Sequence, residues 1–93
     1  MNQIIWSPKA TDAYLDILEI SYYFSMSAAL DLDEKLEKLL NRLQKHKYSC
    51  PPSELLPGTR RCVVTKNVSL VYEIVGDVIQ IILVVDNRMD NLV

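Results

Sequence analysis

The chain has 93 residues, of which 49% are hydrophobic and 24% are charged, a balance that argues against intrinsic disorder. This length suits one compact domain and is too short for two, so we expect residues 1–93 to form a single unit. The formal net charge of -2 and the isoelectric point near 5.2 argue against the broad basic surface that nucleic-acid-binding domains usually carry.

The first residues predict a short strand followed directly by a helix. The strand covers Gln3 to Trp6, and Ser7 and Pro8 come next. Serine is a favoured N-cap residue and proline suits the first helical position, so the helix is expected to start here. Apolar residues then recur at the spacing of one helix face until about Tyr23.

A second helix is predicted from Ser27, its expected N-cap, to about His46. Its apolar stripe is mainly leucine: Ala29, Leu32, Leu36, Leu39, Leu40 and Leu43. The link between the helices is short, which favours an antiparallel hairpin. His46 follows Lys45 at the helix end, where an exposed residue that complements the helix dipole is preferred over a catalytic one.

The second half of the chain predicts a three-stranded antiparallel meander. Pro51 and Pro52 end helical structure because they lack amide donors and favour extended backbone. Strands and tight turns follow, the strands at residues 60–65, 68–75 and 78–85 and the turns at 66–67 and 76–77. The order of elements predicts an α+β fold with the helical hairpin packed on one face of the sheet.

Cys50 and Cys62 are the two cysteines, and neither has a histidine or another cysteine at a metal-ligand spacing. We therefore interpret both as free thiols and predict no metal and no cofactor. Residues 1–6 lack the basic start and the long apolar run of a signal peptide, and no apolar run reaches membrane length. A cytoplasmic protein without membrane contact is the simplest expectation.

Basic residues at strand ends are the candidate binding residues, namely Arg60, Arg61, Lys66 and Arg88. A guanidinium group binds phosphate or carboxylate through two parallel hydrogen bonds, so it can anchor RNA, DNA or an acidic peptide. Successive strand residues point to opposite faces, so Arg60 and Arg61 cannot line one groove unless a bulge intervenes. The alternative interpretation is a set of solvated surface charges.

The polar segment from Asp86 to Asp90 is the predicted location of function, because charged groups at the end of a buried strand are often functional. We therefore expect the activity near Arg88. Asp86 lies two residues before Arg88, on the same side of an extended segment, and is expected to pair with it. Tyr72 and Trp6 are expected to be core aromatic residues.

Three segments, taken together, match the pattern of a known family. They are WSPKA at residues 6–10, LVYEI at 70–74 and VVDNRMD at 84–90. In this combination the chain resembles the RelE/ParE family of bacterial toxins over nearly its whole length. The resemblance implies a growth-inhibiting toxin of a type II toxin-antitoxin module, also called a plasmid stabilisation system, that a cognate antitoxin neutralises.

The resemblance leaves two mechanisms open. RelE-like members cleave messenger RNA on the ribosome with basic side chains on the sheet and an acid/base group, often Tyr, His or Glu, near the C-terminus. ParE-like members lack that set and inhibit DNA gyrase. The matching basic positions hold Arg60 or Arg61, Lys66 and Arg88, which makes them target- or antitoxin-binding residues by resemblance.

The residues after Arg88 favour the ParE-like branch. The sequence continues as Met-Asp-Asn-Leu-Val, without a Tyr or His to exchange a proton, and Asp90 beside Arg88 is a poor substitute. We therefore assign no catalytic residue and prefer a non-enzymatic toxin that acts on DNA gyrase by protein contacts. The alternatives are a ribosome-dependent mRNA endoribonuclease and a non-toxic antitoxin-binding or co-regulatory module.

The resemblance also implies partners, namely a cognate antitoxin and either DNA gyrase or the ribosome with its mRNA. Exposed strand edges and the groove beside the helical hairpin can accept a flexible antitoxin segment as an added strand or helix. Acidic groups on that segment would pair with Arg60, Arg61 and Arg88. The expected assembly is a homodimer or a toxin-antitoxin hetero-oligomer.

Overall fold

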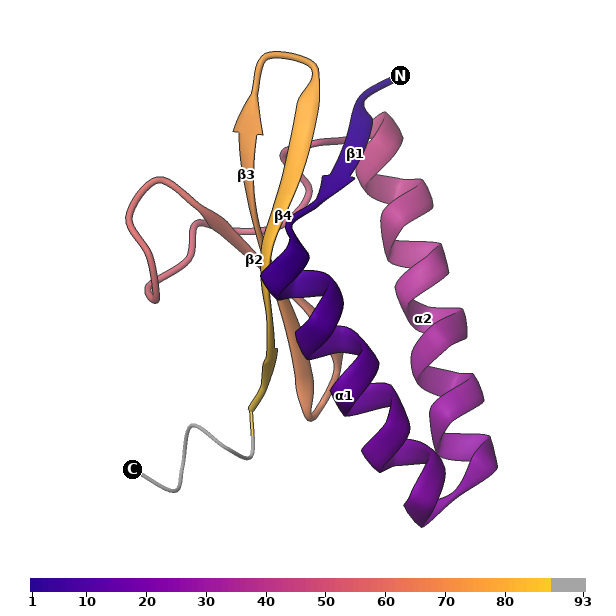
Figure 1. Cartoon of the computed structure of the whole chain (residues 1–93). Helices are drawn as coiled ribbons and strands as arrows, with labels where there is room; N and C mark the ends of the chain where they lie inside the picture. The colour runs from indigo at the N-terminus through magenta and orange to yellow at the C-terminus, as the bar shows by residue number, and fades with distance from the viewer. Residues whose placement is uncertain (88–93) are drawn as a thin grey trace.

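The computed structural model describes residues 1–87, which form the predicted order of strand, helix, helix and three strands (Figure 1). The elements are β1 Gln3–Trp6, α1 Pro8–Phe24, α2 Met26–Lys45, β2 Arg60–Thr65, β3 Val68–Val75 and β4 Val78–Asp86. The expected α+β class is confirmed. Within residues 1–87, neither helix combines the length and the apolar content that a membrane span requires.

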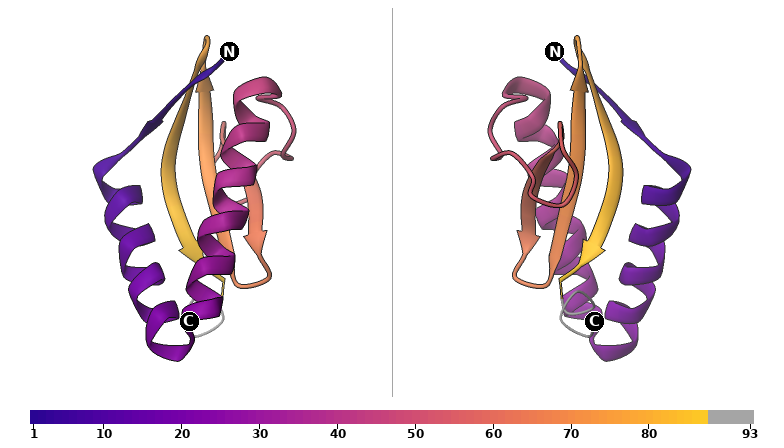
Figure 2. Two further views of the ribbon diagram at one scale, coloured as in Figure 1. Left: turned by 90° about the vertical axis from the view of Figure 1, so that its right-hand side faces the viewer. Right: turned by 90° about the vertical axis from the view of Figure 1, so that its left-hand side faces the viewer.

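The four strands form one mixed sheet in the order β1-β4-β3-β2. Strands β2, β3 and β4 make the predicted antiparallel meander, and β1 pairs with β4 in parallel. The parallel pair arises because the helical hairpin returns the chain to the end of the sheet at which β1 began. Both helices lie on one face, with α1 against β4 and α2 against β2 (Figure 2).

Ser7 holds the corner between β1 and α1, as its sequence position predicts. Its hydroxyl oxygen accepts a hydrogen bond from the Ala10 amide at 3.0 Å, which caps the first turn of α1. The same hydroxyl donates to the Ile82 carbonyl oxygen of β4 at 3.0 Å. One side chain therefore fixes both the start of the helix and its attachment to the sheet.

Ser25, and not Ser27, caps the second helix. The Ser25 backbone is extended, with φ at -168°, and its hydroxyl accepts from the Ala28 amide at 3.3 Å. Its own amide donates to the Ser21 carbonyl oxygen at 2.9 Å, so the residue also closes α1. Ser25 alone joins the helices, so the hairpin is tighter than the sequence predicts.

The core lies between the helical hairpin and one face of the sheet, which we call the covered face; the other is the open face. Its members are mainly leucine and isoleucine from both layers, including Leu32, Leu36, Leu39 and Leu43 of α2 and Leu70, Tyr72, Ile79 and Ile81 of the sheet. Tyr72 is fully buried, which confirms the core prediction. Trp6 lies half-buried at the core's rim, where its ring centre is 5.8 Å from that of Tyr14.

Cys50 and Cys62 form a disulfide, so the prediction of two free thiols was wrong. Their Cα atoms are 5.3 Å apart, and both residues are buried. The loop after α2 runs back along the edge strand β2, where the Arg61 amide donates to the Pro51 carbonyl oxygen at 3.0 Å. This return path places Cys50 beside Cys62, and sequence spacing alone does not reveal such a path.

Candidate functional site

Arg60 and Arg61 are neighbours in sequence but project to opposite faces of the sheet, as strand geometry predicts. Arg60 is paired with Tyr72 of β3, whose side chain lies in the core, and Arg61 is paired with Val71. The register irregularity of β2 comes later, between Val63 and Thr65, so it does not reunite the two guanidinium groups. The two arginines therefore belong to different surfaces.

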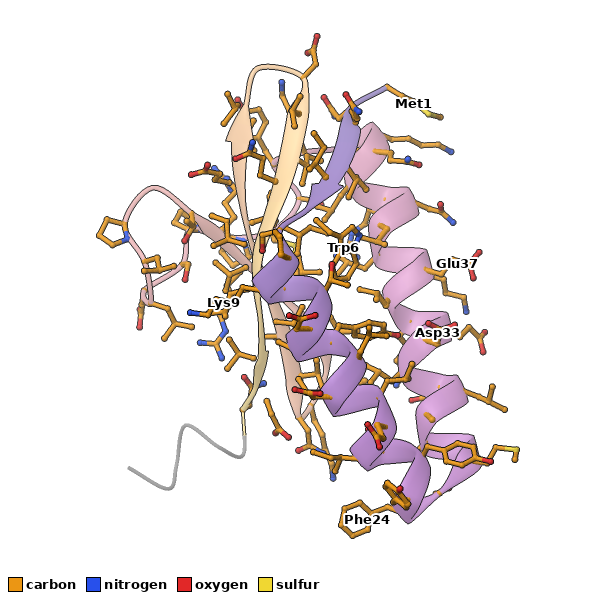
Figure 3. All side chains as sticks on the ribbon, viewed as in Figure 1. Met1, Trp6, Lys9, Phe24, Asp33 and Glu37 are labelled. Atoms are coloured by element: carbon orange, nitrogen blue, oxygen red, sulfur yellow. A yellow bond between two sulfur atoms is a disulfide. The ribbon has the colours of Figure 1, made fainter. Side chains whose placement is uncertain are left out.

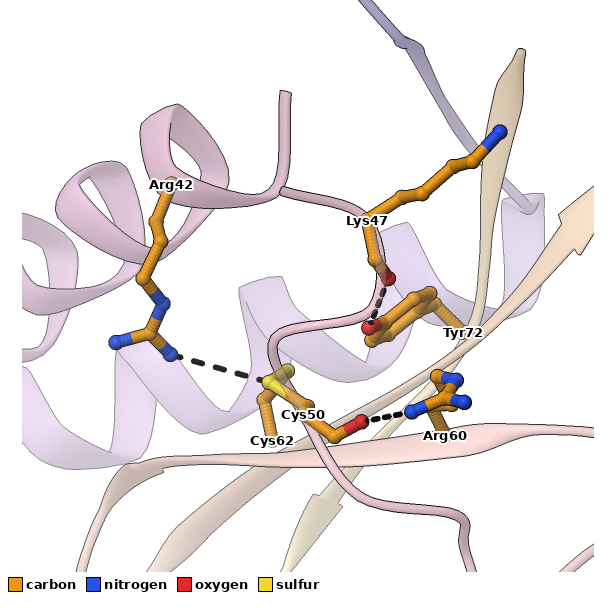
Figure 4. The surroundings of a disulfide bond; sticks show 6 residues. All are labelled: Arg42, Lys47, Cys50, Arg60, Cys62 and Tyr72. Atoms are coloured by element: carbon orange, nitrogen blue, oxygen red, sulfur yellow. Dashed lines mark hydrogen bonds between the residues drawn. A yellow bond between two sulfur atoms is a disulfide. The ribbon is translucent and has the colours of Figure 1, made fainter. Parts of the chain in front are cut away.

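Arg60 lies beside the disulfide. Its Nη1 donates to the Cys50 carbonyl oxygen at 2.5 Å, and its guanidinium carbon is 5.0 Å from the centre of the Tyr48 ring. Arg42 reaches Cys50 from α2, with Nη2 3.8 Å from Cys50 Sγ (Figure 4). Among residues 1–87, no carboxylate oxygen lies within 4.0 Å of either guanidinium.

The Tyr72 hydroxyl holds the loop after α2 against the sheet. That hydroxyl donates to the Lys47 carbonyl oxygen at 2.7 Å and so attaches the loop after α2 to β3 (Figure 4). Burial raises the pKa of Tyr72 above its usual value, although the positive charges of Arg60 and Arg42 oppose the shift. The phenol stays neutral near pH 7 and already has a partner.

Arg61 belongs to a polar network on the open face. Its Nη2 donates to Asn87 Oδ1 at 2.5 Å, and the Ser69 hydroxyl donates to the same oxygen at 3.1 Å. The Asn87 amide donates to the Asn67 carbonyl oxygen at 2.6 Å, which holds the end of β4 against the β2–β3 turn. Asn87 was not among the candidates predicted from the sequence, although its place directly after an apolar strand was a usable signal.

Lys66 lies in the β2–β3 turn and is joined to this network through its backbone, because Asn87 Nδ2 donates to its carbonyl oxygen at 3.5 Å. Its side chain contributes to a cavity of about 410 Å³ between that turn and the helical hairpin, where Phe24 and Lys35 are opposite. The fourth candidate, Arg88, and its expected pairing with Asp86 lie outside the described residues 1–87. Three of the four candidates, Arg60, Arg61 and Lys66, can therefore be placed. Their side chains lie in three different environments.

Among residues 1–87, Glu73 places a carboxylate on the open face, on the strand next to Arg61. Glu73 is on β3, two residues from Val71, and pairs with Gln80 of β4. Since Tyr72 and Ile74 contact the core, the Glu73 side chain is directed to the open face. No group of three His, Cys, Asp or Glu side chains within residues 1–87 is arranged to hold a metal ion.

The helical hairpin exposes an unusual amount of apolar surface. We call it the hairpin surface, and it consists of large side chains that are between 54% and 80% exposed: Leu15, Tyr22, Tyr23, Phe24, Met26 and Leu30. Phe24 projects from the tip of the hairpin (Figure 3). Soluble proteins rarely expose large contiguous apolar patches unless they bind a partner there.

A groove of about 440 Å³ runs along the hairpin surface between the two helices. Leu15, Leu18, Tyr22 and Leu30 line it, and the carboxylates of Glu19 and Asp33 stand at its border. The Asp33 carboxylate also accepts a hydrogen bond from the Tyr14 hydroxyl at 2.7 Å. Burial and this bond both raise the pKa of Tyr14, so the phenol stays protonated at the border of the groove.

Comparison with known proteins assigns the chain to a family. Residues 4–91 match the family described as the ParE toxin of type II toxin-antitoxin systems, parDE. The chain belongs to the ParE toxin family. The resemblance expected from the three sequence segments is confirmed at that level. No curated protein matches the chain in sequence.

Solved structures of other toxins share the fold of this ParE family member. A chromosomal ParDE system from P. aeruginosa gives a TM-score of 0.75 at 23% identity, covering 92% of this chain and 96% of the other. A YoeB/ParE toxin from Agrobacterium tumefaciens gives 0.67 at 14% identity over 90% and 96% of the two chains. The E. coli DinJ-YafQ complex gives 0.65 at 14% identity over 96% and 97%.

Proposed function

We propose that this ParE family member is an active, non-enzymatic toxin that a cognate antitoxin neutralises and that acts on DNA gyrase in the cytoplasm by protein contacts. Its membership of the family supports the toxin assignment. The observation that carries the mode of action is the hairpin surface, whose exposed aromatic and aliphatic side chains suit a protein partner. RNA would instead favour a basic surface, and this chain has a net charge of -2.

The state of Tyr72, Tyr14 and the single histidine also supports this proposal. Tyr72 and Tyr14 have raised pKa values and hydroxyls that already donate to protein acceptors. His46 caps the C-terminal end of α2, away from the Arg61 network. Residues 88–93 contain neither Tyr nor His. Efficient acid/base cleavage of RNA requires such a group within reach of the ribose hydroxyl.

One observation favours the endoribonuclease alternative. Arg61 and Glu73 share the open face, which gives a guanidinium and a carboxylate on one side of the sheet. In that alternative, Arg61 binds the scissile phosphate and Glu73 acts as the base. Glu73→Gln therefore separates the two functions, because it abolishes RNA cleavage and leaves contacts with gyrase through the hairpin surface intact.

The antitoxin is proposed to use both the groove and the basic residues. Solved structures with this fold include a chromosomal ParDE system from P. aeruginosa and the E. coli DinJ-YafQ complex. In this chain the apolar groove bordered by Glu19 and Asp33 suits an amphipathic helix with flanking basic residues. Acidic residues elsewhere in the same segment would meet Arg60, Arg61, Lys66 or Arg88. Charge reversal at Arg88 is expected to weaken antitoxin binding.

The deciding experiment is tightly controlled expression of the chain, with plasmid supercoiling and messenger RNA integrity followed in the same cultures. Growth arrest with altered supercoiling, unchanged in Glu73→Gln, is the expected result. Arrest with cut messages that Glu73→Gln prevents would establish the endoribonuclease. Normal growth with soluble protein would identify a non-toxic antitoxin-binding or co-regulatory module.

A further inference from the structure

A small cationic pocket lies at the end of the sheet where the loop after α2 meets β2. Its volume is about 340 Å³, and its lining comes from Lys47, Tyr48, Gly58, Arg60, Ile74 and Gly76. The guanidinium carbon of Arg60 is 5.0 Å and Lys47 Nζ is 5.7 Å from the centre of the Tyr48 ring. Two positive charges thus converge on one aromatic side chain, which is 64% exposed.

These two cations retain unused hydrogen-bonding capacity. Arg60 donates from Nη1 to the Cys50 carbonyl oxygen, and a guanidinium has five N–H donors in total. Lys47 Nζ donates to the Gly76 carbonyl oxygen at 2.8 Å and lies 3.9 Å from a carboxylate oxygen of Asp77, whose side chain is 93% exposed. Such an exposed pair is weak, so the pocket keeps a positive character.

The pocket is held in place by the surrounding structure. The disulfide fixes Cys50, whose carbonyl oxygen orients Arg60. The Tyr72 hydroxyl fixes the backbone of Lys47 at 2.7 Å. Gly58 and Gly76 border the space, and a Cβ atom at either would meet no other atom within 4 Å. The loop backbone and the Arg60 guanidinium are therefore held in place before a ligand binds, which lowers the cost of ordering.

We infer that this pocket binds a single carboxylate of an acidic peptide segment, the side chain of a Glu or Asp residue. Arg60 would bind it through its free N–H groups, Lys47 would add a second charge-assisted hydrogen bond, and Ile74 and Tyr48 would contact the neighbouring apolar atoms. A nucleic acid is the less suitable ligand, because it needs several phosphate contacts along a basic track and the pocket offers two cations.

This proposal adds a specific ligand group to the proposed antitoxin contact of Arg60. It depends on the proposed function only for the identity of the protein that supplies the acidic segment. The test uses the full chain alone, labelled with ¹⁵N, titrated with the capped peptide acetyl-Gly-Glu-Gly-amide. Saturable NMR shifts are expected at Arg60 Nε and at the amides of Tyr48, Gly58 and Gly76, with a Kd on the order of millimolar. Lys47→Gln and Arg60→Gln are each expected to raise that Kd about tenfold or more.

Controls separate this site from general charge attraction. The matched peptide with Gln in place of Glu should cause no saturable shift, and Lys38→Gln, on the exposed side of α2, should leave the Kd within about twofold. If Arg60→Gln disturbs the loop, Lys47→Gln decides. No saturation, equal binding of the Gln peptide, or saturation by inorganic phosphate alone would overturn the inference. A failed titration alongside intact growth arrest would leave the toxin proposal standing.

Discussion

Adjacent residues of one strand contribute to the core on one face of the sheet and to the surface on the other. On the covered face, Tyr72 and the residues around it are buried beneath the helices or tied to the loop after α2. On the open face, Val63 is 68% exposed and Arg61 is held by a polar network. The core cluster with the helices lies on the covered face, whereas the open face combines the buried Val71 and Ser69 with exposed or polar side chains such as Val63 and Arg61. The exposed part of the open face and the outer side of the hairpin are therefore the surfaces on which a partner could bind.

The largest expected difference between the faces comes from truncating one apolar side chain on each. Leu43 of α2 is fully buried against the covered face, so Leu43→Ala should lower the free energy of unfolding by about 3–4 kcal/mol. Val63→Ala on the open face should change it by less than about 0.5 kcal/mol. Urea unfolding measures both, and comparable losses would refute the assignment of the core to one face.

Reduction of the disulfide tests how much the link between the loop after α2 and strand β2 contributes to stability. The bond closes a loop with a sequence separation of 12 residues. Its loss should lower the free energy of unfolding by about 3 kcal/mol in the chain-entropy treatment. Urea unfolding with and without dithiothreitol provides the measurement. A Cys50→Ser, Cys62→Ser variant serves as control, because the reductant should not affect it. The result also bears on the proposed cytoplasmic location, because thiols in the cytoplasm are usually kept reduced.

Tyr72→Phe tests the attachment of the loop after α2. It removes the 2.7 Å hydrogen bond and leaves the Lys47 carbonyl oxygen without that donor. The expected loss in the free energy of unfolding is about 1–3 kcal/mol. Because Lys47 belongs to the cationic pocket, the variant should also weaken binding of the Glu peptide. An unchanged unfolding curve would show that the other loop contacts, including the disulfide and the bond from the Arg61 amide to Pro51, hold the loop without this hydroxyl.

The phenols of Tyr72, which is fully buried, and Tyr14, which is partly buried, predict a loss of stability in alkali. Burial raises the pKa of Tyr14 and Tyr72 in the folded protein above the usual value of 10.0. The resulting stabilisation is fully present below pH 10 and is lost as the pH rises toward the folded-state pKa, because the unfolded chain ionises first. Unfolding free energies between pH 8 and pH 11 should fall less steeply in a Tyr14→Phe, Tyr72→Phe variant than in the parent chain.

Asn87→Ala should lower the free energy of unfolding by only about 1 kcal/mol, because the network that it removes is only partly buried. Arg61 and Ser69 would lose a shared acceptor, while the backbone bond from residue 87 to Asn67 would remain. Thermal unfolding together with the NMR signal of Arg61 Nε tests this expectation. Gln80→Ala on the same face is the control, and an equal effect there would mean that the network has no special role.

Local sequence signals predicted most of the fold. Ser7 followed by Pro8 located the start of α1, and the leucine stripe located α2, since capping and helical periodicity depend on near neighbours. Periodicity also placed Tyr72 in the core. The N-cap of α2 was predicted at Ser27 but lies at Ser25. Both serines can cap a helix, and only the backbone geometry selects one.

The candidate site was predicted less well. Strand alternation correctly separated Arg60 from Arg61, but it did not identify Asn87 or the pocket around Lys47 and Tyr48. Those groupings join residues that are distant in sequence. Arg61 and Asn87 meet because β2, β3 and β4 lie side by side, and sequence periodicity within each strand carries no information about that contact.

The sequence by itself determined the class of elements, their order and the family, because helix caps, apolar spacing and short motifs are properties of neighbouring residues. Only the tertiary structure decided that Cys50 bonds to Cys62, that β1 pairs in parallel with β4, and that a cationic pocket forms beside the disulfide. Each of these depends on where a loop or a hairpin returns the chain. That path is set by packing of the whole domain against its core.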